Sequence, residues 1–155
     1  MNEVRIARED PRRPEIVAMI GELDRYLGGL YPAESNHLLA LEALSAENVA
    51  FFVARRGGGA AEACGALVRE APDWGEVKRI YVRPAARGLG LGQAVLDAVE
   101  AEGRKIGLRR LRLETGTRQP EALGLFERSG YRRCAAFGAY PLGDPWSIFM
   151  EKALS

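Results

Sequence analysis

The stretch GEVKRIYVRPAARGLGLGQAVLDAVEAEGRKIG, residues 75–107, decides the fold. Its first part carries the β-branched and aromatic residues typical of a buried strand, and Pro84 ends that strand because proline has no N–H to donate. From Ala94 to Ala101, alanine and valine recur at helical spacing. Between strand and helix, the glycines of residues 87–92 (RGLGLG) leave the first N–H groups of the helix uncovered. Such a helix N-terminus, with the basic Arg87 beside it, is a site for phosphate.

Two familiar phosphate motifs do not account for this turn. The Walker A pattern requires Lys and then Ser or Thr after its second glycine, whereas Gly92 is followed by Gln93. The dinucleotide fingerprint, started at Gly88, requires a glycine at position 93. Started at Gly90, it requires a glycine where the chain has Val95. Both patterns are therefore excluded by spacing.

The stretch resembles the pyrophosphate loop of the GNAT (Gcn5-related N-acetyltransferase) superfamily. The family's Arg/Gln-x-x-Gly-x-Gly/Ala motif reads here as Arg87-x-x-Gly90-x-Gly92, after a strand that ends in residues 80–84 (IYVRP). Downstream, residues 111–115 (LRLET) are similar to the family's next strand, and residues 120–131 (PEALGLFERSGY) to its following helix and turn. The chain is identified as a small, single-domain, bacterial-type member over residues 1–155.

The resemblance implies an α/β (α+β) fold with a mixed, mostly antiparallel central sheet of about seven strands and about four helices. The hydrophobic patterns of the chain agree with that order. They predict strands at residues 3–8, 48–56, 62–70, 75–83, 109–115, 131–135 and 147–151. They predict helices from Pro14 to about Gly28-Gly29, around Leu38, Leu41 and Leu44, from the glycine turn to Gly107, and from Pro120 to Gly130.

Composition limits the class of protein. A chain of 155 residues is the usual size of one domain. The 22 basic and 21 acidic residues nearly balance, so no overall field attracts nucleic acid or an anionic membrane. Cys64 and Cys134 are too few for a disulfide scaffold or a cysteine-rich metal site. We expect no metal, and a cytoplasmic protein, since neither a signal peptide nor a transmembrane run is evident.

The cofactor that the resemblance implies is acetyl-coenzyme A, lying in a splay between the two central strands. Backbone groups near Ile80 and Val82 would bind its pantetheine arm. The amides of residues 88–92 would hold its pyrophosphate, and Arg87 would add a charge-assisted contact. The predicted cofactor-binding residues are Ile80, Tyr81, Val82, Arg87, Gly88, Leu89, Gly90, Leu91, Gly92, Gln93 and Phe126.

The expected reaction is direct transfer of an acetyl group from acetyl-coenzyme A to a primary amine of a small molecule. An alkylammonium has a pKa near 10, so a base must take its proton, directly or through water. The candidates are Glu76, which enters the central strand, and Glu114, near the end of the next one. Each carboxylate has the alternative of pairing with a nearby arginine. The backbone N–H of Val82 is the expected oxyanion donor.

The chain departs from the family at the position of the general acid. Many members have a tyrosine where this chain has Phe126, and phenylalanine has no proton to donate. The sulfur leaving group resembles a cysteine thiol, with a pKa of roughly 8.5, and can depart as thiolate. Either no acid is needed, or water or a hydroxyl of Tyr81, Tyr131 or Tyr140 protonates the sulfur.

The acceptor side is less defined. Residues 31–37 form a polar loop that we expect at the lip of the acceptor pocket, and His37 there is either an acceptor ligand or base, or a surface or helix-capping residue. Arg79, Arg112 or Arg118 would bind an acceptor carboxylate, as in an amino acid, or remain solvated. The predicted substrate-binding residues are Ser35, Asn36, His37, Arg79, Arg118 and Tyr140.

Other functions stay open at this point. The aromatic loop at residues 137–146 either closes over a substrate or packs against a partner, and with the C-terminal strand it is a candidate homodimer face. A non-catalytic, regulatory coenzyme A-binding module would explain the missing tyrosine. Acetylation of a protein amine would fit the same chemistry.

Overall fold

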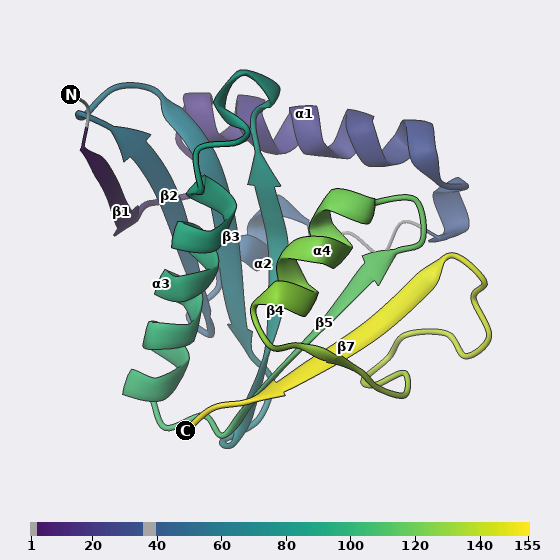
Figure 1. Ribbon diagram of the computed structural model, residues 1–155. Coiled ribbons are helices and arrows are strands. Elements are labelled where there is room, and N and C mark those ends of the chain that lie inside the picture. The colour runs from purple at the N-terminus through teal and green to yellow at the C-terminus, as the bar shows by residue number, and fades with distance from the viewer. Residues whose placement is uncertain (1–2, 36–39) are drawn as a thin grey trace.

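The computed structural model describes residues 3–35 and 40–155. Within them, seven strands form one sheet in the order β1-β2-β3-β4-β5-β7-β6 (Figure 1). The strands are β1 (Val4–Arg8), β2 (Val49–Arg56), β3 (Ala61–Arg69), β4 (Trp74–Val82), β5 (Arg110–Gly116), β6 (Arg132–Arg133) and β7 (Ser147–Ala153). Neighbours pair antiparallel except β4 and β5, which are parallel. The mixed, mostly antiparallel sheet expected from the sequence is confirmed.

Four α-helices cover the two faces of this sheet. They are α1 (Pro14–Leu30), α2 (Leu41–Leu44), α3 (Leu91–Lys105) and α4 (Pro120–Arg128), with 3₁₀ turns at Ala33–Ser35 and Pro84–Ala86. The helices α1 and α2 pack on one face, and α3 and α4 on the other (Figure 1). Proline at the first position of α1 and α4 suits a helix start, where no N–H is required.

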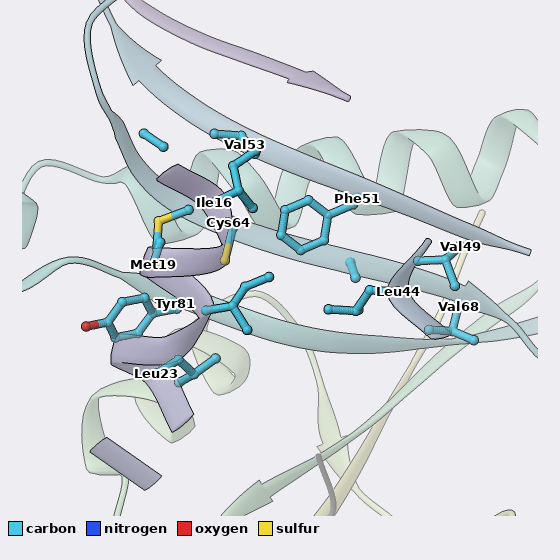
Figure 2. Close-up of a cluster of buried hydrophobic side chains, with 13 residues drawn as sticks. Ile16, Met19, Leu23, Leu44, Val49, Phe51, Val53, Cys64, Val68 and Tyr81 are labelled. Atoms are coloured by element: carbon cyan, nitrogen blue, oxygen red, sulfur yellow. The ribbon is translucent and has the colours of Figure 1, made fainter. Parts of the chain in front are cut away.

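The core has two layers because the sheet is covered on both sides. In the layer under α1, Ile16, Met19 and Leu23 point from the helix towards Phe51, Val53, Cys64 and Tyr81 of the strands (Figure 2). In the layer under α3 and α4, Leu96 and Val99 pack on Leu67, Val77, Leu111, Leu113 and Met150. Residues 49–54 of β2 are all buried, which explains why that strand reads as a continuous apolar run rather than an alternating one.

Three boundaries differ from the expectation. The helix α1 continues through Gly28 and Gly29 to Leu30, because Leu27 still packs on the core and the Tyr31 N–H bonds the Leu27 carbonyl at 3.1 Å. The short helix α2 spans only Leu41–Leu44, and residues 36–39, which include Leu38, lie outside the described chain. The strand expected at 131–135 is reduced to residues 132–133, since it pairs only with β7 at the sheet edge.

None of the helices in the described part of the chain is long and apolar enough to span a membrane.

Candidate active site

The parallel strands β4 and β5 separate in the middle of the sheet. They pair from Trp74 opposite Arg110 to Val77 opposite Leu113. Beyond this point β4 runs on to Val82 and β5 to Gly116 while the two strands diverge (Figure 1). The splay leaves the facing edges of both strands available to a ligand.

A β-bulge shapes β4 at the start of this splay. Cys64 pairs with Tyr81 and Ala66 with Lys78, so Arg79 and Ile80 together oppose the single residue Gly65. Arg79 has a φ of 62°, a left-handed conformation that is costly for a non-glycine residue. Its side chain is 5% exposed and forms an ion pair with Asp24 of α1, which fixes the bulge to the helix above it.

Gly65 is required by the same bulge. A Cβ at this position would lie 2.5 Å from Cδ1 of Ile80 and 2.6 Å from Cγ1 of Val95. The side chain of Ile80 therefore occupies the space that any other residue at position 65 would need. The sequence showed this glycine only as a small residue in a strand.

A cavity of about 430 Å³ lies between the glycine turn, α4 and α1. We call it the loop cavity. Of the residues predicted to bind the cofactor, those that line it are Ile80, Tyr81, Val82, Arg87, Gly88, Gly90, Leu91, Gly92 and Gln93. Leu89 is outside its lining and 50% exposed. Phe126 belongs to a neighbouring cavity.

The N-terminus of α3 faces the loop cavity. Gly90 is its N-cap with φ 78°, and no side chain caps the helix. Gly88 is also in the left-handed region, with φ 82°, and a Cβ there or at Gly90 would meet nothing within 4 Å. The turn thus needs these glycines for their backbone angles, not for lack of space. Arg87 donates from Nε to the Val82 carbonyl at 3.2 Å and lies beside the same turn.

A second, smaller cavity of about 100 Å³ occupies the splay itself. We call it the splay cavity. It shares Leu23, Ile80, Gln119 and Ala122 with the loop cavity, so the two are contiguous. Its other walls are Leu27, Tyr31, Ser35, Val77, Lys78, Arg79, Leu113, Glu114, Thr115, Gly116, Phe126 and Trp146.

The two candidate bases lie in different places. Glu114 lines the splay cavity and accepts a hydrogen bond from Ser147 Oγ at 2.8 Å. Glu76 is 5% exposed and accepts a hydrogen bond from the Tyr140 hydroxyl. It also pairs with Lys78 Nζ at 3.3 Å. Burial raises the pKa of the Glu76 carboxyl, and the ammonium of Lys78 opposes that effect.

Lys78 is common to the splay cavity and to a third cavity, of about 330 Å³, which we call the outer cavity. Glu76 and Tyr140 line only the outer cavity, and Lys78 Nζ donates to the Tyr140 hydroxyl at 2.6 Å. Burial next to the Glu76 carboxylate raises the pKa of Tyr140. Glu114 is therefore the carboxylate in direct reach of a ligand in the splay.

The family model for the acetyltransferase (GNAT) family matches residues 16–131. The chain belongs to the GNAT acetyltransferase family. The IAA acetyltransferase of Azospirillum brasilense is 47% identical over 155 residues, which cover 99% of this chain and 100% of that protein. The uncharacterised N-acetyltransferase YsnE of Bacillus subtilis (strain 168) is 33% identical over 90% of this chain and 93% of its own.

Solved structures agree with the GNAT assignment. A crystal structure assigned to an acyl-CoA N-acyltransferase from Klebsiella pneumoniae subsp. pneumoniae MGH 78578 is 36% identical, with a TM-score of 0.83 over 98% of both chains. The IAA acetyltransferase from Bacillus cereus ATCC 14579 has a TM-score of 0.70 over 98% of this chain and 100% of its own, at 18% identity, and supports the fold alone. The protein is thus an N-acyltransferase of the GNAT type.

GNAT members use acetyl-coenzyme A as the acyl donor, and the loop cavity fits such a group. The uncapped amides at the start of α3 match a pyrophosphate, as does the guanidinium of Arg87 beside them. The side chain of Gln93 is already bonded to Asp97 at 2.8 Å and to Ser129 at 2.9 Å. Gln93 therefore has its backbone N–H to offer a phosphate, and its side chain holds α3 to α4.

The GNAT tyrosine position is apolar here. Phe126 is 5% exposed, lines the splay cavity, and packs edge to face on Tyr131 with ring centroids 5.9 Å apart. Tyr131 is buried and donates to Glu100 Oε2 at 3.0 Å, away from both cavities. Tyr81 lines the loop cavity, and Tyr140 the outer one. Of the three tyrosines considered, Tyr81 borders the loop cavity, but its ring packs in the core layer under α1 and its hydroxyl lies 3.5 Å from Glu22 Oε1.

The predicted acceptor residues are scattered. Ser35 and Arg79 line the splay cavity. The Cζ atom of Arg118 lies 4.4 Å from the centroid of the Trp146 ring. The Cζ atom of Arg112 lies 4.7 Å from the centroid of the Trp74 ring, and Trp74 lines the outer cavity. Asn36 and His37 lie outside the described residues.

Sequence reasoning missed Tyr31, Gln119 and Trp146 as individual site residues, although both loops that carry the aromatics were suspected. Tyr31 is the C-cap of α1, and Trp146 directly precedes β7. The available signal for Tyr31 and Trp146 was an aromatic residue in a polar or glycine-rich loop. The sequence carried no comparable signal for Gln119.

Proposed function

We propose that the protein transfers an acetyl group from acetyl-coenzyme A directly to a primary amine of a small molecule. The observation that carries this proposal is the contiguity of the two cavities, with a carboxylate in the wall of the second. The loop cavity matches the donor, the splay cavity is sized for a small acceptor, and both share Gln119 and Ile80. The 47% identity to a relative named as an IAA acetyltransferase supports acetyl transfer.

Glu114 is the proposed general base. The acceptor enters as an ammonium with a pKa near 10, so its proton must be removed before nitrogen attacks. A carboxylate in the cavity wall takes that proton directly or through one water, and the Ser147 hydroxyl holds it in place. Glu76 is the alternative base and would take the proton through water, because the Lys78 ammonium beside it has no lone pair with which to relay a proton.

The loop cavity would hold the cofactor through the α3 amides, Arg87 and the edge of β4. When bound, acetyl-coenzyme A supplies an activated acetyl group and a thiolate leaving group. The edge of β4 near Val82 offers the backbone N–H for the developing oxyanion. Because Phe126 has no hydroxyl, departure of the sulfur relies on its own acidity, with a thiol pKa of roughly 8.5, or on water.

Two measurements test the proposal in sequence. Acetyl-coenzyme A at about a hundred times its dissociation constant adds roughly 2.7 kcal/mol of stability, which corresponds to a rise in Tm of about 5–10 °C. NAD and ATP serve as controls. Release of free coenzyme A thiol is then measured with and without primary amines, and with IAA in parallel. A thermal shift with no amine-dependent thiol release would indicate a binding module in place of an enzyme.

A matched pair of variants separates the base from its surroundings. Glu114→Gln keeps the shape of the side chain and its contact with Ser147 but removes the base. Glu42→Gln makes the same change on the exposed side of α2, outside the loop, splay and outer cavities. Loss of turnover in the first variant alone supports Glu114. Equal turnover in both variants would transfer the role to Glu76.

A further inference from the structure

Three aromatic side chains from three separate elements line the splay cavity. They are Tyr31 at the end of α1, Phe126 in α4 and Trp146 before β7. Tyr31 and Trp146 meet edge to face with ring centroids 6.2 Å apart. We call these three residues the ring wall. Edge-to-face packing leaves ring surface turned towards the cavity, where another ring adds to the same arrangement.

Tyr31 is held in a fixed position. Its hydroxyl donates to Gln119 Oε1 at 3.1 Å and accepts the Arg118 N–H at 3.0 Å. A Cβ on Gly116 would lie 1.9 Å from that hydroxyl oxygen. The tyrosine is therefore placed by two hydrogen bonds and by a glycine that makes room for it.

Trp146 is held through its main chain and its ring contacts. Its main-chain N–H donates to Asp144 Oδ1 at 2.9 Å, and its main-chain carbonyl accepts the Thr117 N–H at 3.0 Å. The guanidinium of Arg118 lies over its ring at 4.4 Å. The ring wall is thus preorganised, and a ligand does not have to order it on binding.

The size of the splay cavity limits what it accepts. A volume of about 100 Å³ is the share of about three liquid waters and lies below the roughly 150 Å³ of a cavity that holds benzene. One ring therefore fills the splay cavity, and a short chain on that ring has to extend past the shared wall towards the loop cavity.

The cations in the wall are already engaged. Lys78 pairs with Glu76 at 3.3 Å and donates to Tyr140, and Arg79 pairs with Asp24. An acceptor that relied on either cation would have to displace these carboxylates. For the part of the acceptor that does not carry the amine, contacts with the ring wall provide recognition without such a cost.

We propose that the acceptor is an arylalkylamine, in which the primary amine is carried on a short chain from one aromatic ring, and that Tyr31 and Trp146 select it. The inference rests on the proposed acetyl transfer and specifies its substrate class. The ring packs against the ring wall, which directs the amine towards Glu114 and the shared wall of the two cavities.

The test compares three amines by thiol release: phenethylamine, 2-cyclohexylethylamine and n-butylamine. Their ammonium groups are similar, so the panel isolates the ring and its aromaticity. We expect kcat/KM for phenethylamine to exceed that for the saturated ring about three- to tenfold. It should exceed that for butylamine by more than tenfold, because the ring buries additional apolar surface.

A pair of tryptophan variants locates the preference. Trp146→Leu should reduce the ratio of phenethylamine to cyclohexylethylamine to near one. Trp74→Leu changes the other tryptophan of the chain, which lies under Arg112 and outside the splay cavity, and should leave the ratio unchanged. If Trp146→Leu does not fold, fluorescence replaces it. In Trp74→Phe, Trp146 is the single tryptophan, and phenethylamine with coenzyme A should change its emission while butylamine does not.

The outcomes separate the two proposals. Thiol release that is equally fast with butylamine and phenethylamine would overturn the inference and leave acetyl transfer standing. The inference would also be overturned if Trp146→Leu left the ratio of kcat/KM for phenethylamine to that for cyclohexylethylamine unchanged, or if phenethylamine did not change the fluorescence emission of Trp146. A thermal shift with acetyl-coenzyme A but no thiol release for any of these three amines would overturn the inference, and the proposed acetyl transfer would be overturned only if other primary amines, amino acids included, were also inactive.

Discussion

Replacing Gly65 by alanine tests whether the bulge in β4 depends on this glycine. The new Cβ would lie 2.5 Å from Ile80 and 2.6 Å from Val95, distances at which one of the groups must move. Overpacking of this kind costs about 1–3 kcal/mol. For a chain of this size that lowers Tm by about 2–12 °C.

The same change should impair activity. Ile80 lies in the wall shared by the loop and splay cavities, and Arg79 beside it is held in the left-handed region. If the bulge relaxes, both walls shift, so we expect kcat/KM to fall by at least about tenfold. Adding Ile80→Val removes the closer of the two clashing atoms and should restore part of the stability, a coupling that a double-mutant cycle measures.

Gly28→Ala is the matched control. A Cβ at this position in α1 meets nothing within 4 Å, and alanine favours a helix over glycine by roughly 0.5–1 kcal/mol. Its Tm should rise by about 1–4 °C, in the opposite direction to Gly65→Ala. Thermal unfolding by circular dichroism measures both variants. An unchanged Tm and normal turnover in Gly65→Ala would refute the role assigned to this glycine.

Three further changes test the site and its electrostatics. Glu114→Gln should lower kcat/KM at pH 7 by about 10²–10⁴-fold and recover as the pH approaches the amine pKa near 10; a pH–rate profile without this recovery would argue against a base at this position. Arg87→Ala should raise the Kd for acetyl-coenzyme A roughly five- to thirtyfold, since a charge-assisted contact is lost; isothermal titration measures it, and an unchanged Kd would place the phosphate elsewhere. Burial raises the pKa of Glu76 above its unfolded value of 4.5, so the native state keeps a proton that the unfolded chain has released. The contribution of Glu76 to stability should therefore fall as pH rises from 4.5 through the native pKa, and it appears as the difference in free energy of unfolding between the wild type and Glu76→Gln; denaturant unfolding of both proteins across this range measures it, and a difference that does not change with pH would contradict the reasoning.

The order of elements was predictable because each strand and helix carries its own period of apolar residues. The end of α1 was not, because Gly28 and Gly29 break a helix only when tertiary contacts do not hold it, and here Leu27 packs on the core. The bulge was also hidden. An arginine at φ 62° carries no local signature, and its partner Asp24 is 55 positions away.

The glycine turn was readable because a single segment supplies both its geometry and its charge. The choice between Glu76 and Glu114 was not, since it depends on where two strands diverge and on which side Lys78 lies. The ring wall depends on bringing residues 31, 126 and 146 together. The spacing of these three residues along the chain does not indicate that they lie together in the folded protein.

This contrast between the cavities bears on how such enzymes diverge. Much of the loop cavity comes from one stretch, residues 80–93, whereas the splay cavity draws on α1, the turn at residue 35, β4, β5, α4 and the segment before β7. A substitution at a splay-cavity residue that the loop cavity does not share, such as Tyr31, Glu114 or Trp146, can reshape the proposed acceptor cavity while the lining of the loop cavity is kept. Donor use is therefore expected to persist across distant relatives, and acceptor choice to change between close ones. For this family, sequence resemblance is a sound guide to the acyl donor, and the acceptor has to be inferred from the residues that line the acceptor cavity of each protein.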